Sequence, residues 1–155
     1  MEKLKITDLT VSLRKIINAP IEKVFDAWLD AKTLSRFMTP MPGMPEPRVE
    51  ADGKQGGGFT IYMQVGDQEI PHKGQYLEVK RPNKLVFTWE SPFSCDGSNV
   101  SINFTAIDDL STQVDFLHVK FADQQARDNH EGGWNEILDK LDQLLNAAEK
   151  QQAAV

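Results

Sequence analysis

The chain has one cysteine, Cys95, and only three histidines among its 155 residues. A single thiol cannot form an internal disulfide. A chain with so little cysteine is typical of a reducing compartment. The histidines His72, His118 and His130 have no metal-ligand spacing with one another, so no zinc site is expected. A Gly-x-Ser-x-Gly motif and a P-loop are also missing. The motifs therefore predict no catalytic residues, no metal and no cofactor.

Long apolar runs and basic clusters are missing too. No segment approaches the roughly 20 apolar residues that cross a membrane, and the first residues, MEKLKITDLTV, lack the apolar core of a signal peptide. The formal net charge is −6 and no basic stripe with interleaved aromatics occurs, which argues against a nucleic-acid partner. We expect one cytoplasmic domain over residues 1–155, ordered over about 8–147, that exists as a monomer or homodimer.

Hydrophobic periodicity predicts one strand, two short helices, six further strands and one long helix. The strands are expected at 9–17, 47–52, 57–65, 72–80, 84–91, 98–108 and 111–121, and the helices at 21–29, 31–37 and 123–147. Short turns between consecutive strands favour an antiparallel meander. Among the predicted helices, only the last is long enough to cover the apolar face of the sheet that this meander forms. The prediction is an α+β helix-grip fold, in which a curved antiparallel sheet wraps round the C-terminal helix.

The last helix also predicts a cavity. At 100° per residue one face carries small or polar residues in its first half and bulky apolar ones in its second half. These residues are Ala126, His130 and Gly133, followed by Ile137, Leu141 and Leu144. A helix that packs tightly at one end and offers small groups at the other is expected to leave space beneath it.

Several segments, in order along nearly the whole chain, carry a family resemblance. They are Arg14–Trp28 (RKIINAPIEKVFDAW), Gly57–Phe59 (GGF), Gly74–Val79 (GQYLEV), Leu85–Glu90 (LVFTWE) and His130–Leu141 (HEGGWNEILDKL). Together they resemble the family of domains similar to the C-terminal domain of the activator of the heat-shock-protein ATPase. That family belongs to the START-like (SRPBCC) superfamily, with the helix-grip fold of the birch-pollen allergen. The chain departs from the family at Phe37, where tryptophan is usual, and at Lys120, where glycine is usual.

The resemblance implies a hydrophobic cavity between the sheet and the long helix. The predicted ligand-binding residues are Trp28, Phe37, Met38, Met63, Tyr76, Trp89, Phe104, His118, Phe121, His130, Gly133 and Trp134. His130 is expected either to orient a ligand oxygen or to bond a backbone carbonyl, and the direction of His118 is left open because its strand is apolar on both faces. The proline-rich loop 38–47 carries three methionines that suit either a lid over the cavity or a filled core.

Three functions stay open at this point. The first is binding of a small hydrophobic or amphipathic molecule such as a lipid fragment. The second, implied by the resemblance, is a stress-response role as a co-chaperone that activates the heat-shock ATPase. The third is a cyclase- or hydrolase-like enzyme, for which the candidate acids and bases are His118, His130, Tyr76 and Asp115.

Overall fold

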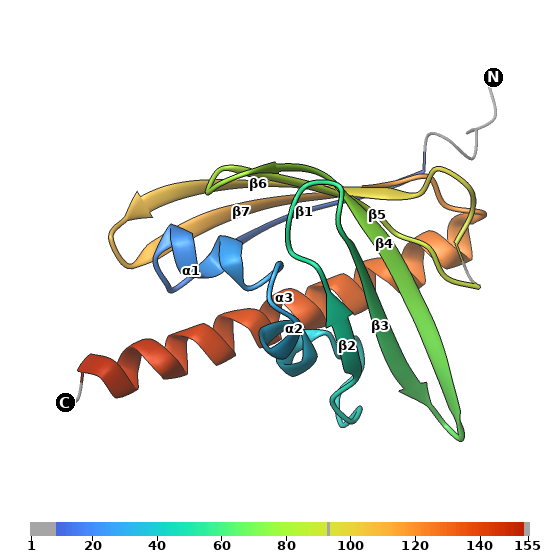
Figure 1. The fold of residues 1–155 in the computed structure, drawn as a ribbon, viewed down its shortest axis with the longest axis horizontal. Coiled ribbons are helices and arrows are strands. Elements are labelled where there is room, and N and C mark those ends of the chain that lie inside the picture. The colour runs from blue at the N-terminus through green and yellow to red at the C-terminus, as the bar shows by residue number, and fades with distance from the viewer. Residues whose placement is uncertain (1–8, 93, 154–155) are drawn as a thin grey trace.

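A strongly curved antiparallel sheet grips one long helix in the computed structural model, which describes residues 9–92 and 94–153 (Figure 1). The strands lie in the order β1-β7-β6-β5-β4-β3-β2. The elements along the chain are β1 (Thr10–Ile17), α1 (Ile21–Asp26), α2 (Ala31–Phe37), β2 (Arg48–Ala51), β3 (Gly58–Val65), β4 (Gln68–Lys80), β5 (Lys84–Thr88), β6 (Asn99–Asp108), β7 (Ser111–Val119) and α3 (Gln124–Ala153). The predicted α+β helix-grip fold is confirmed.

Four elements differ from the predicted bounds by three residues or more. α1 ends at Asp26, three residues before its predicted end. β4 begins at Gln68, four residues early, because Gly66 adopts a φ of +62° and lets the chain reverse at once after β3. β5 ends at Thr88, and only an isolated bridge between Lys73 and Glu90 continues its pairing with β4. α3 runs on to Ala153, through alanine, glutamate, lysine and glutamine, which are strong helix formers.

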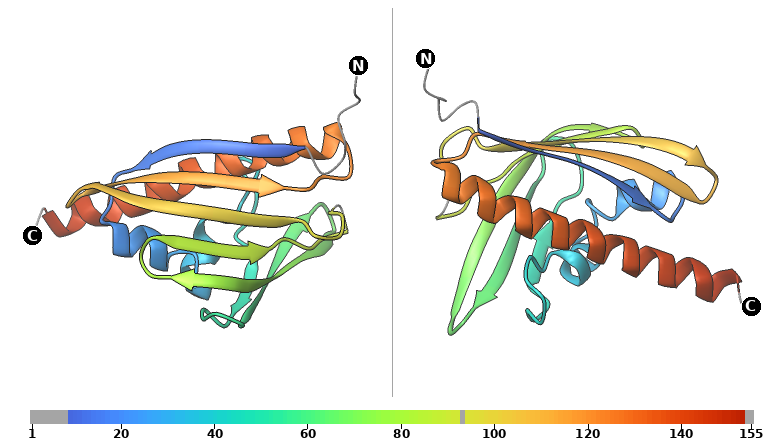
Figure 2. Two further views of the ribbon diagram at one scale, coloured as in Figure 1. Left: turned by 90° about the horizontal axis from the view of Figure 1, so that it is seen from above. Right: turned by 180° about the vertical axis from the view of Figure 1, so that it is seen from behind.

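The helix α3 lies across the concave face of the sheet, as both views of Figure 2 show. Asp123 caps its first turn, since its carboxylate accepts the Ala126 N–H at 2.8 Å. In the second half of the predicted stripe, Ile137 and Leu141 are at most 2% exposed, and Leu144 packs against the core while partly buried. The neighbouring Leu138 is also buried. These side chains join the core formed by α1, α2 and the inward residues of the strands.

Lys120, at one of the two positions where the chain departs from the family it resembles, has a φ of +70°. A residue with a Cβ atom pays roughly 1–2 kcal/mol in this left-handed region, whereas glycine enters it freely. We therefore expect Lys120→Gly to raise the free energy of unfolding by about 1 kcal/mol, measured by urea denaturation. Lys120→Ala is the matched control because it removes the side chain but keeps the strained backbone. An equal gain in both variants would contradict the backbone explanation.

Candidate functional site

The space predicted beneath the long helix is almost filled. A small void in the core has a volume of about 10 Å³. Its walls are Trp28, Leu34, Met38, Phe59, Ile61, Tyr76 and Phe87. That volume admits about one water molecule and no organic ligand. Aromatic side chains close the rest, as in the edge-to-face pair of Trp28 with Phe37, whose ring centroids are 5.2 Å apart.

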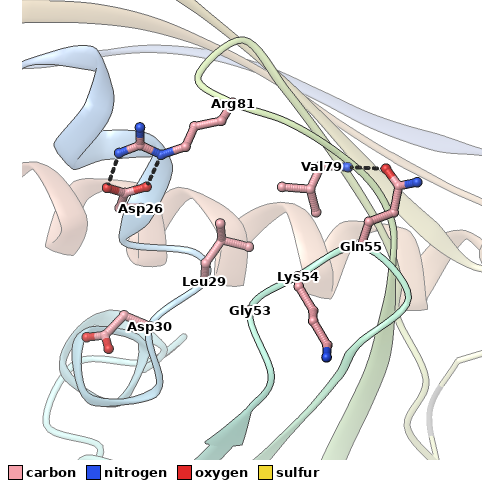
Figure 3. Close-up of a pocket in the computed structure, with 8 residues that line it drawn as sticks. All are labelled: Asp26, Leu29, Asp30, Gly53, Lys54, Gln55, Val79 and Arg81. Carbon is pink, nitrogen blue, oxygen red and sulfur yellow. Dashed lines mark hydrogen bonds and ion pairs between the residues drawn. The ribbon is translucent and has the colours of Figure 1, made fainter.

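A larger depression, of about 520 Å³, lies on the surface between the α1–α2 segment and the β2–β3 loop (Figure 3). The side chains of Leu29 and Val79 converge on it. Some of its polar groups pair with one another: Arg81 donates to both carboxylate oxygens of Asp26, at 2.9 and 2.5 Å, and Gln55 accepts the Val79 N–H at 3.1 Å. These bonds hold the rim together. None of the predicted binding residues lines this depression.

The three histidines, far apart in the sequence, gather at one end of the core. His118 of β7 and His130 of α3 have ring centroids 5.3 Å apart. His72 of β4 lies 5.4 Å from Trp89, whose indole is 4.8 Å from that of Trp134. We call these five residues the histidine end. Inward-facing positions of β4 and β7 and one face of α3 bring the three histidines together. The spacing of the histidines in the sequence does not predict this cluster.

His118 faces inward and is fully buried, which settles its direction. Its Nδ1 accepts the indole N–H of Trp134 at 3.0 Å, and its Nε2 lies 2.6 Å from Oγ of Ser98. Because an indole nitrogen only donates, Nδ1 must be unprotonated and the ring proton sits on Nε2, donated to Ser98. Burial, with a smaller effect of His130, lowers the pKa of His118 to about 3. The ring is therefore neutral at physiological pH.

This tautomer argues against a serine nucleophile. In a nucleophile–base pair the histidine nitrogen that faces the serine must be free to take its proton. Here that nitrogen already carries the proton, since Trp134 occupies the other one. Asp115, another candidate for the enzyme hypothesis, pairs with Arg14 of β1 at 2.6 Å, and its neighbours Val114 and Phe116 are the residues that face the core. Asp115 is thus on the outer face, and its assignment to the pocket is wrong.

His72 and His130 each have one nitrogen engaged and one open. Nδ1 of His130 donates to the Ala126 carbonyl at 2.7 Å, and Nδ1 of His72 donates to the Ile70 carbonyl at 3.1 Å. Burial is the largest influence on both rings and lowers their pKa values. In the neutral form each Nε2 is therefore a lone-pair acceptor, and no described residue bonds to either one. His130 combines both roles that the sequence left open: it bonds a carbonyl and keeps an acceptor.

Three buried polar groups have no hydrogen-bond partner within the described part of the chain. They are the indole N–H groups of Trp28 and Trp89 and the hydroxyl of Thr39. These residues are at most 3% exposed. A buried donor left unpaired costs about 1–3 kcal/mol, so such groups are uncommon in folded proteins and call for a cause. A ligand that supplies acceptors is one such cause.

The comparison with family models decides the relationship. The model described as "Activator of Hsp90 ATPase homolog 1-like protein" matches residues 18–146. The chain belongs to this family. No curated protein matches it. Family membership agrees with the resemblance that the sequence segments carried.

Solved structures share the fold at low identity. A protein from Chromobacterium violaceum has a TM-score of 0.75 at 21% identity, over 88% of this chain and 96% of that one. An "HSP90 activator" from Plasmodium falciparum has a TM-score of 0.72 at 21% identity, over 89% and 96%. The "AHSA1-like protein" from Aeromonas hydrophila has a TM-score of 0.73 at 21% identity, over 90% and 94%. These likenesses establish the fold that members of the family adopt.

The other predicted binding residues lie in the core, and each has different neighbours. Tyr76 donates its hydroxyl proton to the Trp28 carbonyl at 2.7 Å, and burial raises its pKa. Phe104 packs on Phe25 of α1, with ring centroids 5.2 Å apart. Phe121 lies 5.1 Å from His130 and joins the histidine end from the chain after β7. The remaining predicted residues Phe37, Met38 and Met63 are at most 3% exposed.

Sequence reasoning did not select Thr39 or Ser98 as site residues. Both are buried, at 0% and 3% exposure, yet both lie in connecting segments where a polar residue is ordinarily exposed. In the sequence, only the position of Thr39 in the proline-rich loop indicates that it could belong to the site. No sequence feature indicates this for Ser98. Over residues 9–92 and 94–153 no group of three His, Cys, Asp or Glu side chains is placed to hold a metal, and no helix has both the length and the apolarity to span a membrane.

The two adjacent glycines of α3 face different surroundings. A Cβ on Gly133 would lie 3.1 Å from Cβ of Pro40 in the loop, whereas one on Gly132 would meet nothing. Alanine in a helix is worth about 1 kcal/mol over glycine. We expect Gly132→Ala to raise the free energy of unfolding by about that amount. Gly133→Ala should gain nothing or lose stability, because the loop must move aside. Urea denaturation of the two variants compares them directly, and equal gains would contradict the close contact.

Proposed function

We propose that this protein binds a small amphipathic molecule between the sheet and α3, at the histidine end. The observation that carries the proposal is the pair of unpaired buried groups on Trp89, at the histidine end, and on Thr39, in the loop that covers it. Apolar walls supply affinity in such sites, and a few placed polar groups set orientation. The helix-grip fold of the family provides those walls on both sides.

The ligand enters by displacing the loop 38–47, which packs against α3 in this structure. Thr39 is fully buried and Pro40 rests against Gly133, so the loop occupies the place that the small residues of α3 leave. Met41 is half exposed at 50% while Met38 is buried at 1%. Unbranched methionine side chains repack easily, which suits a loop that exchanges its core contacts for contacts with a ligand.

Native mass spectrometry of the purified protein, with denaturing extraction of any passenger, tests the proposal. We expect a stoichiometric amphipathic passenger. The control is the same protein unfolded in urea, dialysed and refolded, which should lose the passenger and regain it from a lipid and metabolite extract of the host. A clean mass in the first sample together with no uptake from the extract would overturn the proposal.

The alternative is activation of a heat-shock chaperone. It is favoured by the family description and by the likeness to the Plasmodium falciparum protein, which is called an HSP90 activator. In that case the outer surface, and not the core, carries the function. A pull-down with the chaperone followed by an ATPase assay tests it. Stimulation of the ATPase by the refolded, passenger-free protein would favour this alternative, and no stimulation would discard it.

A further inference from the structure

We propose that the polar group recognised at the histidine end is an uncharged hydroxyl, which both donates and accepts, and not a carboxylate. This inference rests on the proposed function. It follows from the donors and acceptors that the end presents: one unpaired indole N–H on Trp89, and one open Nε2 acceptor on each of His72 and His130.

These groups belong to one neighbourhood. The ring of His72 is 5.4 Å from the indole of Trp89, and His130 is 5.3 Å from His118, which in turn lies 6.5 Å from Trp89. The loop covers the same place, because Pro40 touches Gly133, one helical turn after His130. Thr39, whose buried hydroxyl is also unpaired, immediately precedes that proline.

Hydrogen-bond chemistry decides between a hydroxyl and a carboxylate. A hydroxyl accepts from the Trp89 N–H and donates its proton to a histidine Nε2, so both partners are satisfied. An ionised carboxylate has no proton to donate and places its charge against two nitrogen lone pairs. That mismatch leaves both Nε2 acceptors without a donor, and sites built for a hydroxyl reject analogues that lack one in a similar way.

The charges around the histidine end also favour a hydroxyl over a carboxylate. None of the ion pairs among the described residues includes a member of this end. His118 has both nitrogens occupied within the protein and offers no positive charge. A buried carboxylate without a cation is strongly unfavourable. The formal net charge of −6 adds a general repulsion of anions.

Three probes of one size separate the possibilities in calorimetric titrations at pH 7.5. 2-Naphthol donates and accepts, 2-methoxynaphthalene only accepts, and 2-naphthoate is ionised at that pH. We expect 2-naphthol to bind at least tenfold more tightly than either analogue. Binding of 2-naphthoate as tight as that of 2-naphthol would overturn the inference while leaving the proposed function in place. No binding of any probe would count against the proposed function itself.

Variants then assign the contacts. His130→Asn keeps an N–H that can reach the Ala126 carbonyl but lacks Nε2, whereas His130→Gln places an acceptor near the Nε2 position. We expect the first to reduce 2-naphthol binding to the level of the ether and the second to restore it. The same Asn and Gln pair at His72 tests the other ring. If neither Asn variant removes the preference for the hydroxyl, the inference is wrong.

Trp89→Phe removes the unpaired N–H and keeps a buried aromatic ring. We expect it to weaken 2-naphthol and 2-methoxynaphthalene alike, because both accept from that N–H. Trp28→Phe is the matched control, since Trp28 is equally buried and also unpaired but lines the small void and is not part of the histidine end. It should leave the affinities for both probes unchanged, and a loss of affinity in Trp28→Phe but not in Trp89→Phe would contradict the placement.

Discussion

Gly74→Ala is expected to lower the free energy of unfolding by about 3 kcal/mol, one of the largest effects of a single methyl group in this protein. A Cβ at Gly74 would lie 2.2 Å from the Thr88 carbonyl oxygen and 2.2 Å from Cζ of Phe59. The phenyl ring can rotate, but the carbonyl belongs to the backbone of β5 and can yield only if the strand moves. Thermal and urea denaturation measure the loss, which corresponds to a fall of about 10 °C in Tm.

The absence of a side chain at Gly74 also affects how the residues of the histidine end pack. β4 points His72, Gly74 and Tyr76 toward the core, and the Phe59 ring fills the place above the glycine. That ring lies 6.2 Å from Trp89. We therefore expect the tryptophan fluorescence of folded Gly74→Ala to differ from that of the parent protein.

Gly58→Ala is the control for this prediction, since the position lies on the neighbouring strand and is cross-strand to Gln75. Its added Cβ would meet only the Gly74 carbonyl oxygen, at 3.3 Å. We expect a change within about 1 kcal/mol. A similar loss in the two variants would mean that glycine in β-strands generally, and not the contact with Thr88, decides the stability at Gly74.

The order of the elements could be predicted from the sequence because periodicity is a local property. Alternation in the strands and the 3.6-residue repeat of α3 each follow from which side chains face the core. The short connections between strands were expected as well, but the length of the β3–β4 turn was not, because Gly66 adopts a positive φ and lets β4 begin at Gln68. The buried half of α3, from Ile137 to Leu141, has the environment that its stripe implied.

The contents of the site could not be predicted, because they depend on contacts between distant segments. Small residues in the first half of α3 indicated a cavity, but the loop fills that place, with Pro40 against Gly133. One of the two partners of His118 is Ser98, which lies in a connection with no pattern of its own. The meeting of three histidines depends on the curvature of the sheet, which brings β4 and β7 to the same end of α3.

The stability of the protein is expected to fall steeply below pH 6.5 because His118 is buried in its neutral form. Its pKa is about 3 in the folded protein and near 6.5 in the unfolded chain, so the unfolded state binds a proton that the folded state refuses. The stabilising contribution is complete above pH 6.5 and is lost as the pH falls from 6.5 toward 3. At pH 4.5 the loss from this residue is about 3 kcal/mol.

Urea denaturation at a series of pH values from 7.5 to 4.5 measures this dependence, and His118→Asn isolates the residue. Asparagine can present an acceptor to the Trp134 N–H but does not titrate, so the slope of stability against pH should fall by about one proton. His72 and His130, whose pKa values are also lowered by burial, contribute in the same direction in both proteins and cancel in the comparison. A proton NMR titration of the parent protein gives an independent reading: the His118 ring should stay neutral at pH 4.5. A ring that titrates near pH 6.5 in the folded protein would refute the lowered pKa that burial gives this ring.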